Sequence, residues 1–134
     1  MESVCSICVG EISHHPHDAN LMLRAHCIAR QFYEYWLDSQ LPMMEEAKFI
    51  NTQCQAFLEI NDNVLQNMCI QFQESGEVSG YRLFKLSQCV FQDKVNWGRI
   101  ISIFAFATKL MSRENSDLII QWLTHVLFMN TIWV

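Results

Sequence analysis

Proline and glycine are scarce in this chain of 134 residues, which has only two prolines and four glycines. Both residue types interrupt helices, so their scarcity leaves room for long helical segments. No segment shows the alternation of apolar and polar residues that is typical of a half-buried strand. The length is that of one domain, and a hydrophobic content of 51% is sufficient for a sizeable core. We therefore expect residues 1–134 to form one all-α domain.

Basic residues are also few: nine lysines and arginines stand against 14 aspartates and glutamates, which gives a net charge of −5. The nine are scattered, so no basic patch is available to neutralise the phosphates of a nucleic acid. No apolar run approaches the roughly 20 residues of a membrane-spanning helix, and no signal peptide opens the chain. We expect a cytoplasmic protein with no membrane anchor of its own, whose six cysteines are reduced thiols rather than disulfides.

Catalytic motifs are absent as well. The sequence contains no nucleophile elbow, no glycine-rich loop for phosphates and no His-Glu-x-x-His helix, so we expect neither an enzyme nor a cofactor. One set of metal-binding residue types near the N-terminus leaves a small zinc module as an alternative: Cys5, Cys8, His14, His15 and His17. No second paired cluster follows, and Pro16 separates the histidines. A mobile arm over residues 1–18 is the preferred interpretation.

Apolar residues recur at helical spacing along most of the chain and predict about six helices. Their expected bounds are about 19–37, 44–60, 63–72, 81–92, 97–112 and 117–130. Asn61-Asp62-Asn63 is expected to end the second helix and to cap the third, because these residue types favour helix ends. The segment from Ile100 to Met111 is apolar on nearly every side, so we expect it to be the central, most buried helix. Asn96 is its expected N-cap.

Eight residues at the start of that helix carry a recognisable motif. Asp93-Lys94-Val95-Asn96-Trp97-Gly98-Arg99-Ile100 resembles the first homology motif of the Bcl-2 family of apoptosis regulators, whose core is Asn-Trp-Gly-Arg. As in that family, the motif lies between an amphipathic helix and an apolar one. The resemblance covers about residues 19–134 in the order of elements, and close identity is confined to about residues 81–107. It implies a Bcl-2-like helical bundle around a central apolar helix.

Two other family motifs are incomplete in this sequence. The third homology motif has a Leu-x-x-x-Gly-Asp core, whereas the nearest register here, Ile50 to Gln55, lacks both the glycine and the aspartate. This disfavours a pro-death member that exposes its own motif. The second motif begins with an aromatic residue and continues into one or two more helices, but this sequence ends at Thr131-Ile132-Trp133-Val134. The resemblance therefore implies a bundle that is C-terminally truncated relative to the family, most similar to its short, divergent viral members.

The same resemblance implies an inhibitor of apoptosis. Such a protein sequesters pro-death relatives of the Bim, Bak or Bax type by binding their amphipathic third-motif helix in a surface groove. Through these partners it would be recruited to the mitochondrial outer membrane. The alternative is a helical self-assembly protein that binds no death ligand and uses its apolar surface only to associate with copies of itself.

Arg99 is the central candidate of the ligand groove. A cation in the first turn of a helix opposes the macrodipole, so Arg99 either simply reaches water or awaits a carboxylate from a partner. The resemblance implies that Arg99 pairs with the aspartate of the partner's third motif, that Asn96 and Gly98 approach the partner nearby, and that Trp97 packs as structural support. Groove walls are expected from the third and fourth helices, with ordinary core packing as the alternative for each residue: Val64, Leu65, Met68, Phe72, Tyr81, Phe84 and Val90.

The absence of further C-terminal helices leads to one more expectation. In the family these helices cover one end of the groove, so without them an apolar surface would be left exposed. Two-fold pairing is the commonest way for identical chains to cover such a surface. We therefore expect a homodimer that buries Trp133 and part of the groove rim, and that competes with the ligand.

Overall fold

The computed structural model describes residues 16–38 and 43–130, and over these residues it contains five helices and no strand. The helices are α2 (Pro16–Leu37), α3 (Glu45–Glu74), α4 (Gly80–Val90), α5 (Trp97–Leu110) and α6 (Ser116–Met129). The prediction of an all-α fold is confirmed over the described residues. Residues 1–15 of the expected arm, with most of the zinc candidates, lie outside the described residues, and so does Trp133. Residues 16–18, which were expected to belong to that arm, instead form the first turn of α2.

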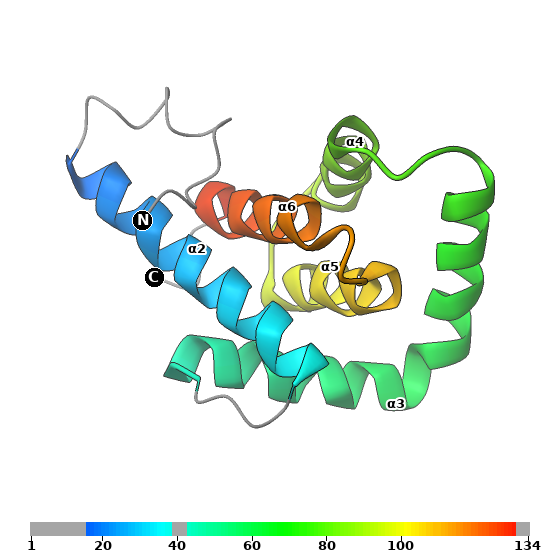
Figure 1. Ribbon diagram of the computed structural model, residues 1–134, viewed down its shortest axis with the longest axis horizontal. Helices are drawn as coiled ribbons and strands as arrows, with labels where there is room; N and C mark the ends of the chain where they lie inside the picture. Colours follow the sequence, from blue (N-terminus) through cyan, green and yellow to red (C-terminus); the bar gives the residue numbers. More distant parts are fainter. Residues whose placement is uncertain (1–15, 39–42, 131–134) are drawn as a thin grey trace.

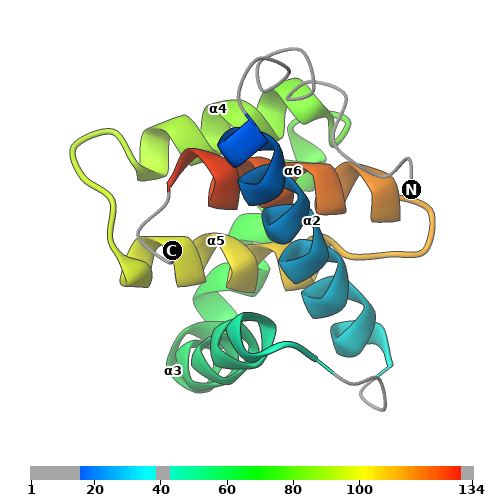
Figure 2. The ribbon, with the colours of Figure 1, turned by 90° about the vertical axis from the view of Figure 1, so that its left-hand side faces the viewer.

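The helix α5 lies at the centre of the fold, as its composition predicts. Eight of its 14 residues are buried. The side chain of Asn96 caps it by accepting a hydrogen bond of 2.9 Å from the backbone N–H of Arg99. In Figures 1 and 2, α6 runs alongside α5 in the opposite direction, while α2 crosses both helices. The first part of α3 covers the remaining side of α5.

Aromatic contacts fix the neighbours of α5 along its length. Phe104 packs edge-on against Phe32 of α2, with 5.0 Å between the ring centroids. Phe106 makes a similar contact of 5.7 Å with Phe72, near the end of α3. Edge-to-face pairs of this kind add to the stabilisation that comes from apolar burial alone. The middle of the central helix is therefore held from two sides by specific ring contacts.

The predicted break at Asn61-Asp62-Asn63 is wrong, because α3 is one helix of 30 residues that runs through this segment. Asparagine and aspartate are only modestly poorer helix formers than alanine, so packing can override them. The buried face of α3 continues on both sides of the segment, with Cys54 before it and Leu65 after it. Asp62 also forms an ion pair with Lys109 of α5. Tertiary contacts thus keep this segment helical, although its local preference is to end a helix.

A bend is what remains of the predicted break. Figure 1 shows α3 running along the bottom of the bundle and then turning upward in its second half. The side-chain amide of Asn61 donates to the carbonyl of Phe57, one turn earlier, at 3.1 Å. Side chains that bond to the preceding turn compete with the helical hydrogen bonds and commonly bend helices. We attribute the bend to this competition, and it brings the second half of α3 around the C-terminal end of α5.

Arg82 fastens the end of α3 to the start of α4. Its guanidinium donates to the carbonyl of Phe72 at 2.6 Å and to the hydroxyl of Ser75 at 2.7 Å. The same group donates to the carbonyl of Gly76 at 2.8 Å and lies 4.0 Å above the Phe72 ring. Gly76 has a φ of 151°, which a residue with a side chain rarely adopts. Arg82 therefore satisfies one carbonyl in the last turn of α3, that of Phe72, and two carbonyls of the loop that follows, those of Gly76 and Glu77.

Two further properties of the fold bear on function. Within the described part of the chain, no helix combines the length and the apolar character that a membrane crossing requires. The four cysteines in that part are free thiols: Cys27, Cys54, Cys69 and Cys89. Burial raises the pKa of Cys54 and of Cys69, so both thiols stay protonated and serve as small apolar core residues.

Candidate functional site

The candidate site lies at the corner where α4 ends and α5 begins. Arg99 lies in the first turn of α5, and its Nη1 donates a hydrogen bond of 2.8 Å to the backbone carbonyl of Val90, the last residue of α4. The same nitrogen forms an ion pair with the carboxylate of Asp93, which lies in the loop between the two helices. Arg99 therefore spans the corner from one helix to the other and holds a carboxylate there.

Solvent reaches both partners of this ion pair, Asp93 far more than Arg99. The side chain of Arg99 is 32% exposed and that of Asp93 is 75% exposed. The hydrogen bond from the Arg99 guanidinium lowers the pKa of Asp93, so the carboxylate is ionised at neutral pH. Ion pairs as exposed as this contribute little to stability, because water and salt screen them. A competing carboxylate could therefore replace Asp93 without damage to the fold.

Asp93 is a site residue that the sequence reasoning missed. Arg99 was expected either to reach water or to await a carboxylate from a partner, but in the described structure it already has an internal one. The sequence does contain a hint of this pairing, because Asp93 belongs to the same motif as Arg99 and lies six positions before it, across a turn. Sequence spacing alone does not fix how such a turn folds, so the pairing needed the structure to become visible.

The other motif residues surround Arg99 in different roles. Asn96 is committed to capping α5, which fixes the backbone from which Arg99 projects. Gly98 is exposed, and the nearest atom among the described residues to a β-carbon added there would be Asn96 Oδ1, at 3.4 Å. Trp97 packs edge-on against Phe49 of α3, with 4.9 Å between ring centroids. The backbone near Arg99 is therefore open to a partner, while Trp97 faces its own chain.

The wall residues predicted on α3 divide into an exposed and a buried group. Val64 is 58% exposed and Met68 is 46% exposed, and with Ile60, which is 84% exposed, they form an apolar stripe with a spacing of four residues. Leu65 is only 6% exposed and belongs to the core instead. Phe72 is half-buried between Phe106 and Arg82. Of the wall residues predicted on α3, only Val64 and Met68 are therefore exposed, and Ile60 extends them into a stripe.

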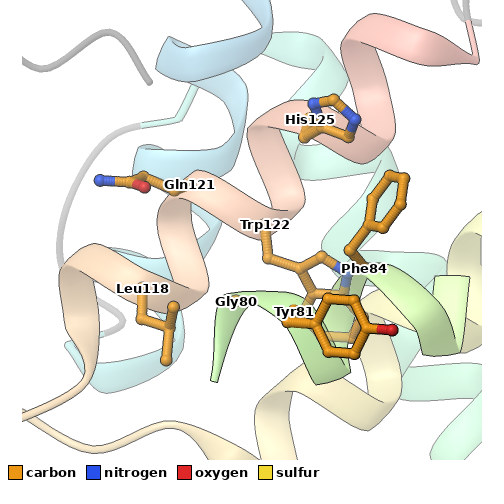
Figure 3. Close-up of a pocket in the computed structure, with 7 residues that line it drawn as sticks. All are labelled: Gly80, Tyr81, Phe84, Leu118, Gln121, Trp122 and His125. Atoms are coloured by element: carbon orange, nitrogen blue, oxygen red, sulfur yellow. The ribbon is translucent and has the colours of Figure 1, made fainter. Parts of the chain in front are cut away.

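The wall residues predicted on α4 also divide, this time between two faces of the helix. Val90 lies at the Arg99 corner, where its carbonyl accepts the hydrogen bond from Arg99. Phe84 faces α6, where its ring meets His125 with 5.9 Å between ring centroids, so the structure does not place it beside Arg99. Tyr81 is 70% exposed at the start of α4. Tyr81 and Phe84 both line a pocket of about 280 Å³ between α4 and α6 (Figure 3).

A second hollow lies on the other side of α4, toward the end of α3. It has a volume of about 290 Å³ and is lined by Phe72, Tyr81, Arg82, Lys85, Leu86 and Cys89. This hollow continues the surface between α3 and α4 on which the groove was expected. The sequence reasoning did not include Arg82, Lys85 or Cys89, because a search for apolar spacing passes over such residues.

A comparison with known protein families matches residues 50–131 to the Bcl-2 family of apoptosis regulator proteins. The match includes the α4–α5 corner and more than half of the chain. The chain belongs to the Bcl-2 family. Comparisons with curated proteins and with solved structures find no match.

Membership of the Bcl-2 family sets the general function of the site. The protein is a regulator of apoptosis, and proteins of this family interact with other members of the family. Regulators of this kind are in general not enzymes.

Proposed function

We propose that this Bcl-2 family protein restrains cell death by binding the amphipathic third-motif helix of pro-death relatives of the Bim, Bak or Bax type. The ligand would lie between α3 and α4 and across the start of α5, with its apolar residues against the stripe of Ile60, Val64 and Met68. Its aspartate would pair with Arg99. A protein in this role would act in the cytoplasm, or at the mitochondrial outer membrane where its partners bring it.

The observation that carries this proposal is the carboxylate already held by Arg99. The guanidinium is anchored to the carbonyl of Val90, so its direction is fixed before any partner arrives. An aspartate from a partner would need only to take the place of Asp93. Preorganisation of this kind favours binding because less conformational freedom is lost when the complex forms.

Apolar contact would supply most of the binding free energy. An amphipathic helix places apolar residues three or four positions apart, and the stripe on α3 has the matching spacing of four. Each Å² of apolar surface removed from water contributes about 25 cal/mol. Arg99 would then set the register of the ligand, while the stripe would provide the affinity.

Isothermal titration against a panel of third-motif peptides of the Bim, Bak and Bax types tests the binding. We expect one peptide per chain. The direction of regulation needs a second experiment, in which the protein is expressed in cells that are exposed to a death stimulus. Increased survival would support the pro-survival role, and increased death would reject it. If no peptide of the panel binds, the groove proposal fails as a whole.

Self-association is the second candidate function, and the exposed apolar stripe on α3 also favours it. A second copy of the chain could cover Ile60, Val64 and Met68, as two-fold pairing commonly does for apolar surfaces. We propose a homodimer that uses part of the ligand surface. Light scattering at micromolar concentration tests it, with and without a bound peptide. A dimer that dissociates as peptide is added supports a shared surface, whereas a monomer under both conditions rejects the dimer.

A further inference from the structure

The pocket between α4 and α6 lies on a different face of α4 from the Arg99 corner and needs its own explanation. Figure 3 shows that aromatic side chains dominate its lining, and its volume is about 280 Å³. The described residues that line it are Gly80, Tyr81, Phe84, Leu118, Gln121, Trp122 and His125. No lysine or arginine is among them. The pocket is therefore suited to an uncharged, mainly apolar occupant.

Trp122 gives the pocket one unsatisfied polar group. The residue is only 5% exposed, and among the described residues nothing accepts a hydrogen bond from its indole nitrogen. Buried donors without an acceptor are uncommon in folded proteins. In Figure 3 the nitrogen lies on the side of the indole toward Phe84, and it is buried. An acceptor that entered the pocket from this side would complete its hydrogen bonding.

We propose that the α4–α6 pocket binds a small, uncharged, largely apolar molecule with one carbonyl group, whose oxygen accepts a hydrogen bond from Trp122 Nε1. The volume is near the lower end of the roughly 300–1,000 Å³ that is typical of ligand pockets, so the ligand is about the size of a bicyclic ring. The aromatic walls favour a flat ring through edge and stacking contacts. The buried donor without an acceptor, Trp122 Nε1, determines how the ligand is oriented.

Two side chains that line the pocket with Trp122 can move without a change in the core. Phe84 is 41% exposed and Tyr81 is 70% exposed, whereas core side chains such as Leu123 are fully buried. Rotation of the Phe84 ring away from His125 would widen the pocket on the Phe84 side of the indole, and it would leave the packing of α5 and α6 in place. The ligand therefore replaces a loosely held side-chain cover rather than part of the core.

Gly80 offers a way to close the pocket. A β-carbon added there would meet the Cδ1 atom of Leu118 at 3.8 Å, which is an ordinary contact and the nearest one found among the described residues. The φ of Gly80 is not in the left-handed region, so a side chain is compatible with its backbone. The substitution Gly80→Leu should thus fill the pocket from the first turn of α4 while the helix stays folded.

A matched pair of probes tests the proposal on the whole chain. 1-Tetralone and tetralin have the same bicyclic skeleton, but only 1-tetralone has a carbonyl oxygen. Titration followed by ¹⁵N–¹H spectra should show the indole N–H resonance of Trp122 shifting downfield with 1-tetralone and not with tetralin. We expect 1-tetralone to bind about fivefold tighter, the factor that one net hydrogen bond typically contributes. Equal affinities, or no shift of the Trp122 resonance, would overturn the proposal.

Three variants separate the hydrogen bond from the pocket. Trp122→Phe keeps an aromatic ring but removes the donor, so it should bind both probes with equal affinity. Trp36→Phe, on α2 and outside the pocket, is the control and should keep the fivefold preference. Gly80→Leu should give the circular dichroism spectrum of a folded protein, and it should bind neither probe. A preference that survives in Trp122→Phe, or probe binding that survives in Gly80→Leu, would reject this assignment of the site.

Discussion

Arg99 and Asp93 form an ion pair across the α4–α5 loop, six positions apart in the sequence. In the proposed complex the same guanidinium pairs with an aspartate of the ligand. Binding would then exchange one carboxylate for another: Asp93 would return to water, and the incoming aspartate would become buried. If the proposal is correct, Asp93 of the free chain is an internal competitor for the position that the ligand's aspartate would occupy.

Removal of this competitor should strengthen binding. Asp93→Asn keeps the size of the side chain but removes its charge, so Arg99 is released for the peptide. We expect a dissociation constant a few-fold lower than that of the wild type, because an exposed pair competes only weakly. Isothermal titration measures it, with Glu77→Gln as the control because Glu77 is an exposed acidic residue in the α3–α4 loop. Weaker binding by Asp93→Asn would contradict this, because it would show that the Asp93 carboxylate contributes to peptide binding rather than competing with it.

Loss of the Arg82 side chain should loosen the end of α3. Arg82→Ala removes hydrogen bonds to the carbonyls of Phe72 and Gly76 together with the stacking on the Phe72 ring. We expect a loss of about 1–3 kcal/mol in the free energy of unfolding, since hydrogen bonds from charged groups are the stronger ones. Amide hydrogen exchange should speed up most in the last turn of α3. Lys85→Ala on the same helix is the control, and an equal effect there would contradict this role.

The ion pair between Arg24 of α2 and Glu46 of α3 should make stability depend on pH. The hydrogen bond from Arg24 lowers the pKa of Glu46 below the ordinary value of 4.5. The contribution of this ion pair to the free energy of unfolding is therefore fully present above pH 4.5. It is lost as the pH falls through the lowered pKa of Glu46. Glu46→Gln should thus destabilise the protein at pH 7 by up to about 1 kcal/mol. Urea unfolding should show the difference from wild type shrinking below pH 4.5, and a difference that grows on acidification would contradict this.

Much of the fold could be predicted because helical periodicity and capping are local signals. The apolar stretch after Asn96 predicts the central helix, and the structure confirms both the helix and its cap. Asn61-Asp62-Asn63 misled the prediction, because the segment's local preference competes with packing against α5 that no local pattern reveals. The segment bends the helix without ending it.

The site was predicted less completely, for a related reason. Periodicity shows which residues share one face of a helix, but not which neighbour that face meets. Its spacing therefore predicted that Phe84 lines the groove, although its ring packs toward α6. Leu65 and Val64 are adjacent and both apolar, yet one is buried in the core and the other lies on the surface. The pairing of Asp93 with Arg99 depends on the path of a loop, which spacing does not determine.

The central claim is that Arg99 is a ligand-binding residue, and one titration tests it most directly. Arg99→Ala should weaken a third-motif peptide at least tenfold, because removal of one side of a desolvated charge pair typically costs about 2–5 kcal/mol of binding. Its melting temperature should fall only slightly, since the ion pair to the exposed Asp93 contributes little and water can take over the hydrogen bond to the Val90 carbonyl. Arg113→Ala, at an exposed arginine in the α5–α6 turn, should bind like the wild type. A folded Arg99→Ala variant with unchanged peptide affinity would contradict the account.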